Sequence, residues 1–198
     1  LSDRIVAVKL LHAYLDSDRE REKFLQEARL LARLTHQYIL PIHDVGFSDE
    51  APYIVVEYAP GGSLRDRLKR LPGPFALAEA LRLLIQIGQA LDHAHQQNII
   101  HRDLKPENIL FNQYGDGLLS DFGIATVVNT SSMRQTGIIG TPTYMAPEQF
   151  QGTASKEGDQ YALGCLAYEL FTGRKVFDAP NFVAMGYLHA TEAPTPPT

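Results

Sequence analysis

Three side chains that handle charge lie within six residues of one another, in the stretch 100–110. The carboxylate of Asp103 can accept a proton from a hydroxyl group. The ammonium of Lys105 can neutralise a phosphate in transfer, and the side-chain oxygen of Asn108 can bind a divalent cation. An acid, a cation and a carboxamide on one short loop therefore predict phosphoryl transfer.

A second carboxylate follows a short apolar stretch. Residues 118–120 predict a strand that leads directly into Asp121, and the glycine-bearing residues 113–117 predict a hairpin turn before that strand. Because a hairpin brings its two ends together, Asn108 and Asp121 are expected to lie near each other. The two side chains could then share one metal ion.

Four short motifs occur along the chain in order. They are Val6-Ala7-Val8-Lys9, His101-Arg102-Asp103 with Asn108, Asp121-Phe122-Gly123 and Ala146-Pro147-Glu148. In this order and spacing they resemble the catalytic domain of a eukaryotic-type (Hanks-type) Ser/Thr protein kinase, here of bacterial type. The resemblance covers nearly the whole chain.

The resemblance implies an α+β, bilobal protein-kinase-like fold. Residues 1–58 would form part of a small β-rich lobe with one helix, and residues 63–198 part of a larger, mainly helical lobe. Residues 59–62, which contain Pro and Gly, would be the hinge. The chain starts at the lysine strand and stops before the last helices of the large lobe, so we expect a fragment of a longer kinase. Without the glycine-rich loop, this fragment is expected to bind ATP poorly.

The resemblance also implies catalytic roles. Asp103 would be the catalytic base and Lys105 would contact the γ-phosphate of ATP. Asn108 and Asp121 would bind Mg²⁺, with Mn²⁺ as an alternative. Lys105, two residues after Asp103, is the family's mark of Ser/Thr rather than Tyr specificity. Thr141, in the substrate-docking end of the activation segment, would reach back toward Asp103 and Lys105.

Two charged residues near the N-terminus have both an ordinary and a functional interpretation. Residues 4–11 alternate like a strand, with Ala7 and Lys9 on one face, and an isolated lysine there is usually an edge-strand residue. By resemblance, Ala7 packs on the adenine and Lys9 contacts the α- and β-phosphates. Residues 16–34 predict a helix that carries Glu27, either a solvated acid or, by resemblance, the ion-pair partner of Lys9.

The remaining nucleotide contacts rest on the resemblance. Residues 39–45 and 53–58 predict a hairpin of two strands that runs into the hinge. The backbone of Glu57 and Ala59 would hydrogen-bond the adenine, and the side chain of Val56 would limit access to the pocket behind the adenine. Leu110 would form the floor beneath the adenine.

The rest of the chain predicts helices. Residues 63–69 form a short helix and residues 77–96 a long one, with Leu77, Leu81, Leu84, Gly88 and Leu91 along its apolar face. His93 and His95 are two residues apart, so they point in different directions, and ordinary packing is the interpretation we favour for both. Asp159, before a helical run at 161–171, is either a helix N-terminal acid or, by resemblance, holds the backbone of the catalytic loop.

Residues 124–139 are polar and aperiodic, which predicts a loop. By resemblance, Arg102 would bind a phosphate on this loop. Thr136 is the best-placed acceptor, with Ser132 as a second, and autophosphorylation would raise activity. An unmodified polar loop is the alternative.

Composition limits the choice of partners and compartment. The chain has 198 residues, 44% of them hydrophobic, and a net charge of −5, so a nucleic-acid surface is not expected. No apolar run approaches the roughly 18 residues that span a bilayer. A single cysteine, Cys165, suits a buried thiol in a reducing, cytoplasmic setting. A membrane anchor could lie in a part of the parent protein outside this chain.

The sequence therefore predicts an ATP- and Mg²⁺-dependent kinase that phosphorylates Ser or Thr in protein substrates, with self-association for trans-autophosphorylation. Two alternatives stay open. A pseudokinase scaffold would normally lack the lysine, the base or a metal ligand, and all of these are present. A small-molecule phosphotransferase would not need the docking segment 140–148.

Overall fold

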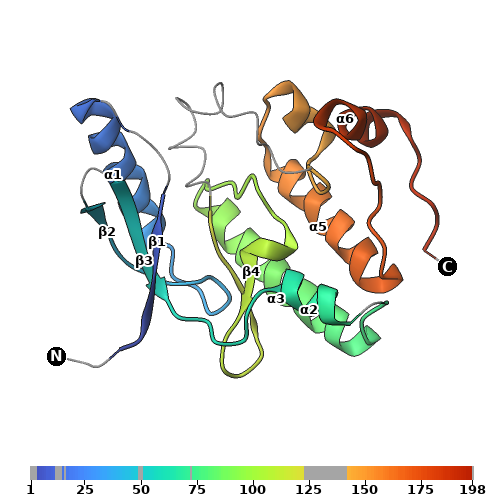
Figure 1. Ribbon diagram of the computed structural model, residues 1–198, viewed down its shortest axis with the longest axis horizontal. Helices are drawn as coiled ribbons and strands as arrows, with labels where there is room; N and C mark the ends of the chain where they lie inside the picture. The colour runs from blue at the N-terminus through green and yellow to red at the C-terminus, as the bar shows by residue number, and fades with distance from the viewer. Residues whose placement is uncertain are drawn as a thin grey trace.

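The computed structural model describes residues 4–11, 15, 17–48, 51–71, 73–122 and 142–197. A three-stranded antiparallel sheet lies at one end of the molecule beside helix α1 (Figure 1). Its strands are β1 (Val6–Leu10), β2 (Ile42–Ser48) and β3 (Ala51–Glu57), in the order β1-β3-β2. The three predicted strands and the β2–β3 hairpin are confirmed, with ends shifted by up to three residues.

Helix α1 (Asp18–Ala32) covers this sheet. Its N-cap is Ser17, whose hydroxyl accepts the Glu20 backbone N–H at 3.3 Å. Phe24 and Ala28 are buried with Ile54 of β3, as their spacing predicts. Leu30 of the same helix is 55% exposed and takes no part in this contact.

The other end of the molecule is mainly helical (Figure 1). It contains the helices α2 (Leu64–Arg70), α3 (Leu77–Gln96), α5 (Lys156–Thr172) and α6 (Phe182–Thr191). A hairpin of β4 (Ile109–Phe111) and β5 (Gly117–Leu119) packs against α3, and the short 3₁₀ helices are η1 (Pro106–Asn108) and η2 (Pro147–Gln151). None of the helices in these described ranges has the length and apolarity needed to cross a membrane.

The main core lies between α3, α5 and the β4–β5 hairpin. Ile87 of α3 and Leu166 of α5 are fully buried in it. Cys165 is buried there too, as predicted, and burial raises the pKa of its thiol to about 11. This thiol is therefore protonated at neutral pH and behaves as a small apolar side chain.

The buried face of α3 differs from the predicted one. Leu77 and Leu81 are 66% and 45% exposed. The buried apolar residues include Leu91 from the predicted face, and the others are Ala80, Leu83, Ile87, Ala90 and Ala94. The helix carries apolar residues around most of its circumference. The packing of α5 and β5 decides which side is buried.

Two backbone connections join the sheet end to the helical end. The loop after α1 pairs with β5, since Leu40 N–H donates to the Leu119 carbonyl and Leu119 N–H to the Tyr38 carbonyl, at 2.9 and 2.8 Å. The predicted hinge is held on β4, because Gly61 N–H donates to the Phe111 carbonyl at 2.9 Å. A Cβ on Gly61 would lie 2.6 Å from the Cβ of Phe111, so only glycine allows this approach.

Candidate active site

The three predicted residues of the catalytic loop form one hydrogen-bonded cluster. Lys105 Nζ lies 2.6 Å from Asp103 Oδ2, and Asn108 Nδ2 donates to the same oxygen at 3.1 Å. Asn108 also donates to the backbone carbonyl of Asp103 at 2.7 Å. The side chain of Asp103 is still 47% exposed, so its carboxylate is accessible to a substrate hydroxyl.

The backbone of this loop is strained, and hydrogen bonds to a carboxylate of α5 hold it in place. Arg102 has φ of +70°, a left-handed conformation that is costly for a non-glycine residue. The buried carboxylate of Asp159 accepts the backbone N–H groups of both His101 and Arg102 at 2.8 Å. This confirms that Asp159 holds the backbone of the catalytic loop.

His95 is a third partner of this carboxylate, which sequence analysis missed. Its Nε2 lies 2.7 Å from Asp159 Oδ2. The interpretation of His95 as ordinary packing was therefore incomplete. Spacing along α3 could not reveal this contact, because Asp159 lies 64 residues away in the sequence.

His101 is fully buried beneath the loop. Its Nδ1 accepts the Asp103 backbone N–H at 3.2 Å, so its Nε2 must carry the proton that is shared with the Ser120 carbonyl at 2.8 Å. Burial lowers the pKa of His101, which agrees with a neutral ring. The ring packs edge-on against Phe122 and fixes the distance between the catalytic loop and the end of β5.

The β4–β5 hairpin places the two predicted metal ligands side by side. Ser120 donates its backbone N–H and its hydroxyl to the Asn108 carbonyl, at 2.8 and 3.0 Å. The next residue, Asp121, has φ of +63°. The amide oxygen of Asn108 and the carboxylate of Asp121 are the kind of hard oxygen donor that Mg²⁺ prefers.

The lysine of β1 does not pair with the glutamate of α1. Lys9 Nζ forms an ion pair with Asp121 Oδ1 at 2.7 Å, whereas Glu27 pairs with Lys23 at 3.8 Å on the same helix. The predicted Lys9–Glu27 ion pair is therefore not formed in this structure. Lys9 nevertheless lies at the end of β5, beside the predicted metal site.

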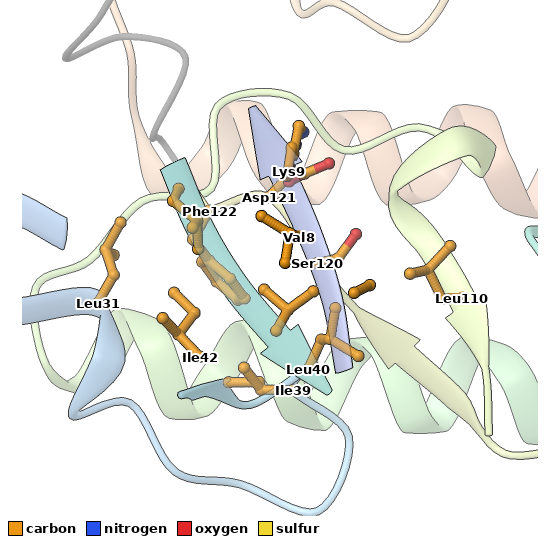
Figure 2. Close-up of a pocket in the computed structure, with 13 residues that line it drawn as sticks. Val8, Lys9, Leu31, Ile39, Leu40, Ile42, Leu110, Ser120, Asp121 and Phe122 are labelled. Atoms are coloured by element: carbon orange, nitrogen blue, oxygen red, sulfur yellow. Dashed lines mark ion pairs between the residues drawn. The ribbon is translucent and has the colours of Figure 1, made fainter. Parts of the chain in front are cut away.

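A cavity of about 210 Å³ lies between the sheet and the β4–β5 hairpin (Figure 2). Its lining is mostly apolar and includes the predicted nucleotide contacts Ala7, Lys9, Val56 and Leu110. The carboxylate of Asp121 lies at its edge. A cavity with apolar walls and a few charged groups on one side suits a flat, apolar ring that carries a charged tail.

The other predicted nucleotide contacts lie outside this lining. Glu57 donates its backbone N–H to the Pro41 carbonyl at 2.9 Å, so only its carbonyl is left for an adenine. Ala59 follows β3 in the predicted hinge. Their roles stay predictions.

Three predicted residues lie outside the described residues. These are Thr141 in the docking segment and Ser132 and Thr136 in the polar loop. Arg102, the predicted partner of a phosphate on Ser132 or Thr136, is described and has an exposed side chain.

Arg65, whose side chain is 17% exposed, joins four segments near the loop, and sequence analysis missed it. Arg65 of α2 donates to Glu107 at 2.8 Å, to Glu169 of α5 at 3.1 Å and to the Tyr144 hydroxyl at 2.6 Å. Burial alone would lower the pKa of Arg65, but the hydrogen bond with Glu107 and the contacts with Tyr144 and Glu169 raise it. Burial, together with the short hydrogen bond to Glu169, also raises the pKa of the Tyr144 hydroxyl. In the sequence, Arg65, Glu107 and Glu169 look like ordinary surface charges and Tyr144 like an ordinary core residue, so no sequence signal marks the network.

Comparison with known proteins identifies the family. The family described as "Protein kinase domain" matches residues 1–192. Among curated proteins, the probable serine/threonine-protein kinase CE0033 of Corynebacterium efficiens is 42% identical over 207 residues, which cover 100% of this chain and 31% of that protein. The serine/threonine-protein kinase PrkC of Bacillus subtilis is 40% identical, over 98% of this chain and 30% of that protein. PknB of Mycolicibacterium smegmatis is also 40% identical, over 98% and 32%.

These comparisons confirm the resemblance and the two-lobed α+β fold, with a sheet-bearing part and a mainly helical part. The chain spans about 31% of the length of the curated relatives it matches. Motif, geometry and similarity agree, and the chain belongs to the protein kinase domain family.

Proposed function

We propose that the protein is a serine/threonine kinase that transfers the γ-phosphate of ATP to hydroxyl groups of protein substrates. The observation that carries this proposal is the hydrogen-bonded cluster of Asp103, Lys105 and Asn108. The ion pair of Lys9 and Asp121 lies next to this cluster, across the β4–β5 hairpin. The names of the relatives support the same reaction.

In this proposal the catalytic loop handles protons and charge. Asp103 accepts the proton of the substrate hydroxyl. Lys105, which lies 2.6 Å from that carboxylate, neutralises charge on the transferred phosphate. The Asn108 side chain orients Asp103 through its Nδ2, and its Oδ1 faces no hydrogen-bond donor in the described part of the chain.

The oxygen donors near β5 fit a divalent cation. Asn108 Oδ1 and the Asp121 carboxylate would hold Mg²⁺, with Mn²⁺ as an alternative. Bound there, the ion would neutralise the phosphates of ATP. One carboxylate and one amide are few ligands, which matches the way Mg²⁺ is held partly by substrate phosphates. With Asp121 engaged by metal, Lys9 is free to contact the α- and β-phosphates.

The cavity beside these charges would hold the adenine. Ala7 and Val56 would contact the ring from the sheet and Leu110 from the hairpin. The Glu57 carbonyl and the Ala59 N–H would hydrogen-bond its edge, in a hinge at 59–62 between units 1–58 and 63–198. Self-association for trans-autophosphorylation and a cytoplasmic location of this domain belong to the same proposal.

The proposal is tested by Asp103→Asn in the full-length protein, assayed with labelled ATP, Mg²⁺ and a generic basic protein. The side chain keeps its size but loses its proton affinity, so kcat should fall by about 10²–10⁴-fold with nucleotide binding unchanged. Asp92→Asn, an exposed change on α3, is the matched control. Equal protein phosphorylation by the Asp103→Asn variant and the parent would refute the role of Asp103. A parent that binds ATP without transfer would indicate a scaffold instead, and transfer to small molecules alone a different phosphotransferase.

A further inference from the structure

Gln149 of η2 joins the segment before that helix to the catalytic loop. Its Oε1 accepts the Ala146 backbone N–H at 2.9 Å, and its Nε2 donates to the Arg102 carbonyl, also at 2.9 Å. Arg102 lies 47 residues earlier in the sequence. The carboxamide of Gln149 thus joins two segments: its oxygen accepts from the segment before η2, and its NH₂ group donates to the catalytic loop.

The contact falls on the peptide group that directly precedes Asp103. The carbonyl of this peptide belongs to Arg102 and is held by Gln149, while its N–H belongs to Asp103 and is held by His101 Nδ1 at 3.2 Å. Both polar atoms of the peptide are therefore fixed by side chains. The orientation of this peptide sets the direction in which Asp103 leaves the loop.

This peptide is also where the loop is strained. Arg102 has φ of +70°, and such a conformation persists only when the surroundings hold it in place. Asp159 holds the Arg102 N–H from α5 at 2.8 Å, and Gln149 holds its carbonyl from η2. Without Gln149, the peptide between Arg102 and Asp103 would keep only the hydrogen bond from the Asp103 N–H to His101 Nδ1, so its orientation would be less firmly fixed.

We propose that Gln149 is a positioning residue for Asp103 that couples the orientation of the catalytic carboxylate to the segment 143–146. This inference rests on the proposed kinase function and adds to it a link between the loop that performs the transfer and the segment assigned to substrate docking. The role requires a carboxamide. A glutamate would turn a carboxylate oxygen toward the Arg102 carbonyl, and a methionine would satisfy neither segment.

The test compares three variants of the full-length protein: Gln149→Glu, Gln149→Met and, as a control, Gln151→Glu. Gln151 lies on the same 3₁₀ helix and is exposed, so the control introduces the same charge without touching the loop. Two quantities are measured. The first is kcat and KM, for ATP and for a protein substrate. The second is amide hydrogen exchange at Arg102 and Asp103, which needs no catalysis.

Both Gln149 variants should lower kcat by about 10- to 100-fold, the range for a misplaced catalytic group, while KM for ATP changes little. The amides of Arg102 and Asp103 should exchange about tenfold faster, since the peptide has lost one of its two restraints. Gln151→Glu should match the parent in both measurements.

The inference is overturned if a folded Gln149 variant retains the kcat of the parent and its slow exchange at Asp103. Gln149→Met is neutral, so it decides the matter even if the added charge of Gln149→Glu prevents folding. If the parent protein transfers no phosphate to protein substrates, the proposed function is wrong. Amide exchange at Asp103 in the Gln149 variants then still shows whether Gln149 restrains this peptide.

Discussion

At the scale of single residues, the ion pair between Lys9 and Asp121 shows how Asp121 can exchange one positively charged partner for another. Both side chains are partly exposed, at 50% and 32%, and an ion pair with that exposure stabilises a protein by only about 0–1 kcal/mol. A divalent cation can therefore replace Lys9 beside Asp121 at small cost. The pair is compatible with a lysine that contacts phosphate once metal is bound.

This exchange of partners leads to a prediction for Asp121→Asn. The amide binds a cation more weakly than the carboxylate, so the Mg²⁺ concentration for half-maximal activity should rise by about 10- to 100-fold. Activity is measured over a Mg²⁺ titration at saturating ATP, with Asp44→Asn on β2 as the control. An unchanged Mg²⁺ requirement would remove Asp121 from the proposed metal site.

At the scale of secondary-structure elements, α5 is the support of the catalytic loop. Ser155 caps the helix by accepting the Gly158 N–H at 2.9 Å, and Asp159 then lies in its first turn, only 2% exposed. Because Leu166 anchors the same helix in the core, the carboxylate is held in a fixed position. Helix α5 therefore restrains the backbone of the catalytic loop.

Asp159→Asn should therefore loosen the loop and destabilise the fold. The new NH₂ group would face backbone N–H donors of His101 or Arg102, which leaves a buried donor unsatisfied. The free energy of unfolding should fall by about 1–3 kcal/mol, as measured by urea denaturation, with a lower kcat. Stability and kcat equal to those of the parent would show that the loop does not depend on this carboxylate.

The polar loop 124–139 is the second element for which we make a prediction. Autophosphorylation of Thr136, with Ser132 as a second site, should raise activity, because a phosphate adds about −1.5 to −2 charges near the exposed Arg102. Mass spectrometry of the active full-length protein, beside a Thr136→Ala variant, tests this. A fully active protein whose loop carries no phosphate would exclude the mechanism.

At the scale of the whole molecule, a buried histidine joins two elements that lie far apart in the sequence. His101 joins α5, through Asp159, to the end of β5, through Ser120, and its ring packs on Phe122. The same region lies under the cavity and beside the catalytic loop. Any change in the charge of this ring would act on the catalytic loop, on α5 and on the end of β5 at once.

The stability of the fold should therefore depend on pH. Burial lowers the pKa of His101 below the value near 6.5 of an unfolded chain. Above pH 6.5 the His101 ring is neutral in both the folded and the unfolded chain, and its contribution to the free energy of unfolding is fully present. As the pH falls below about 6.5, the unfolded chain binds a proton that the folded ring refuses, so stability falls by up to about 1.4 kcal/mol per pH unit.

Urea unfolding at pH 7.5, 6.5 and 5.5 measures this loss, and NMR of the His101 ring protons assigns it. The ring should stay neutral in the folded protein well below pH 6.5. A ring that titrates at or above pH 6.5 in the folded state would contradict the buried neutral tautomer.

The sequence by itself determined those features that depend on neighbours along the chain. Asp103, Lys105 and Asn108 lie within six residues of one another, so a short loop brings them together, and a hairpin turn is enough to bring Asp121 beside them. The bounds of α3 are those predicted, because its apolar residues repeat with a helical period over five turns. These local rules also account for the family resemblance.

Only the tertiary structure decided which of several available partners each side chain meets. The buried face of α3 was mispredicted because the helix is apolar on more than one side and the packing of α5 and β5 selects among them. Lys9 was predicted to pair with Glu27 and pairs with Asp121 instead. Gln149 and Arg102 are 47 residues apart, and no periodicity connects residues that meet only when separate elements pack together.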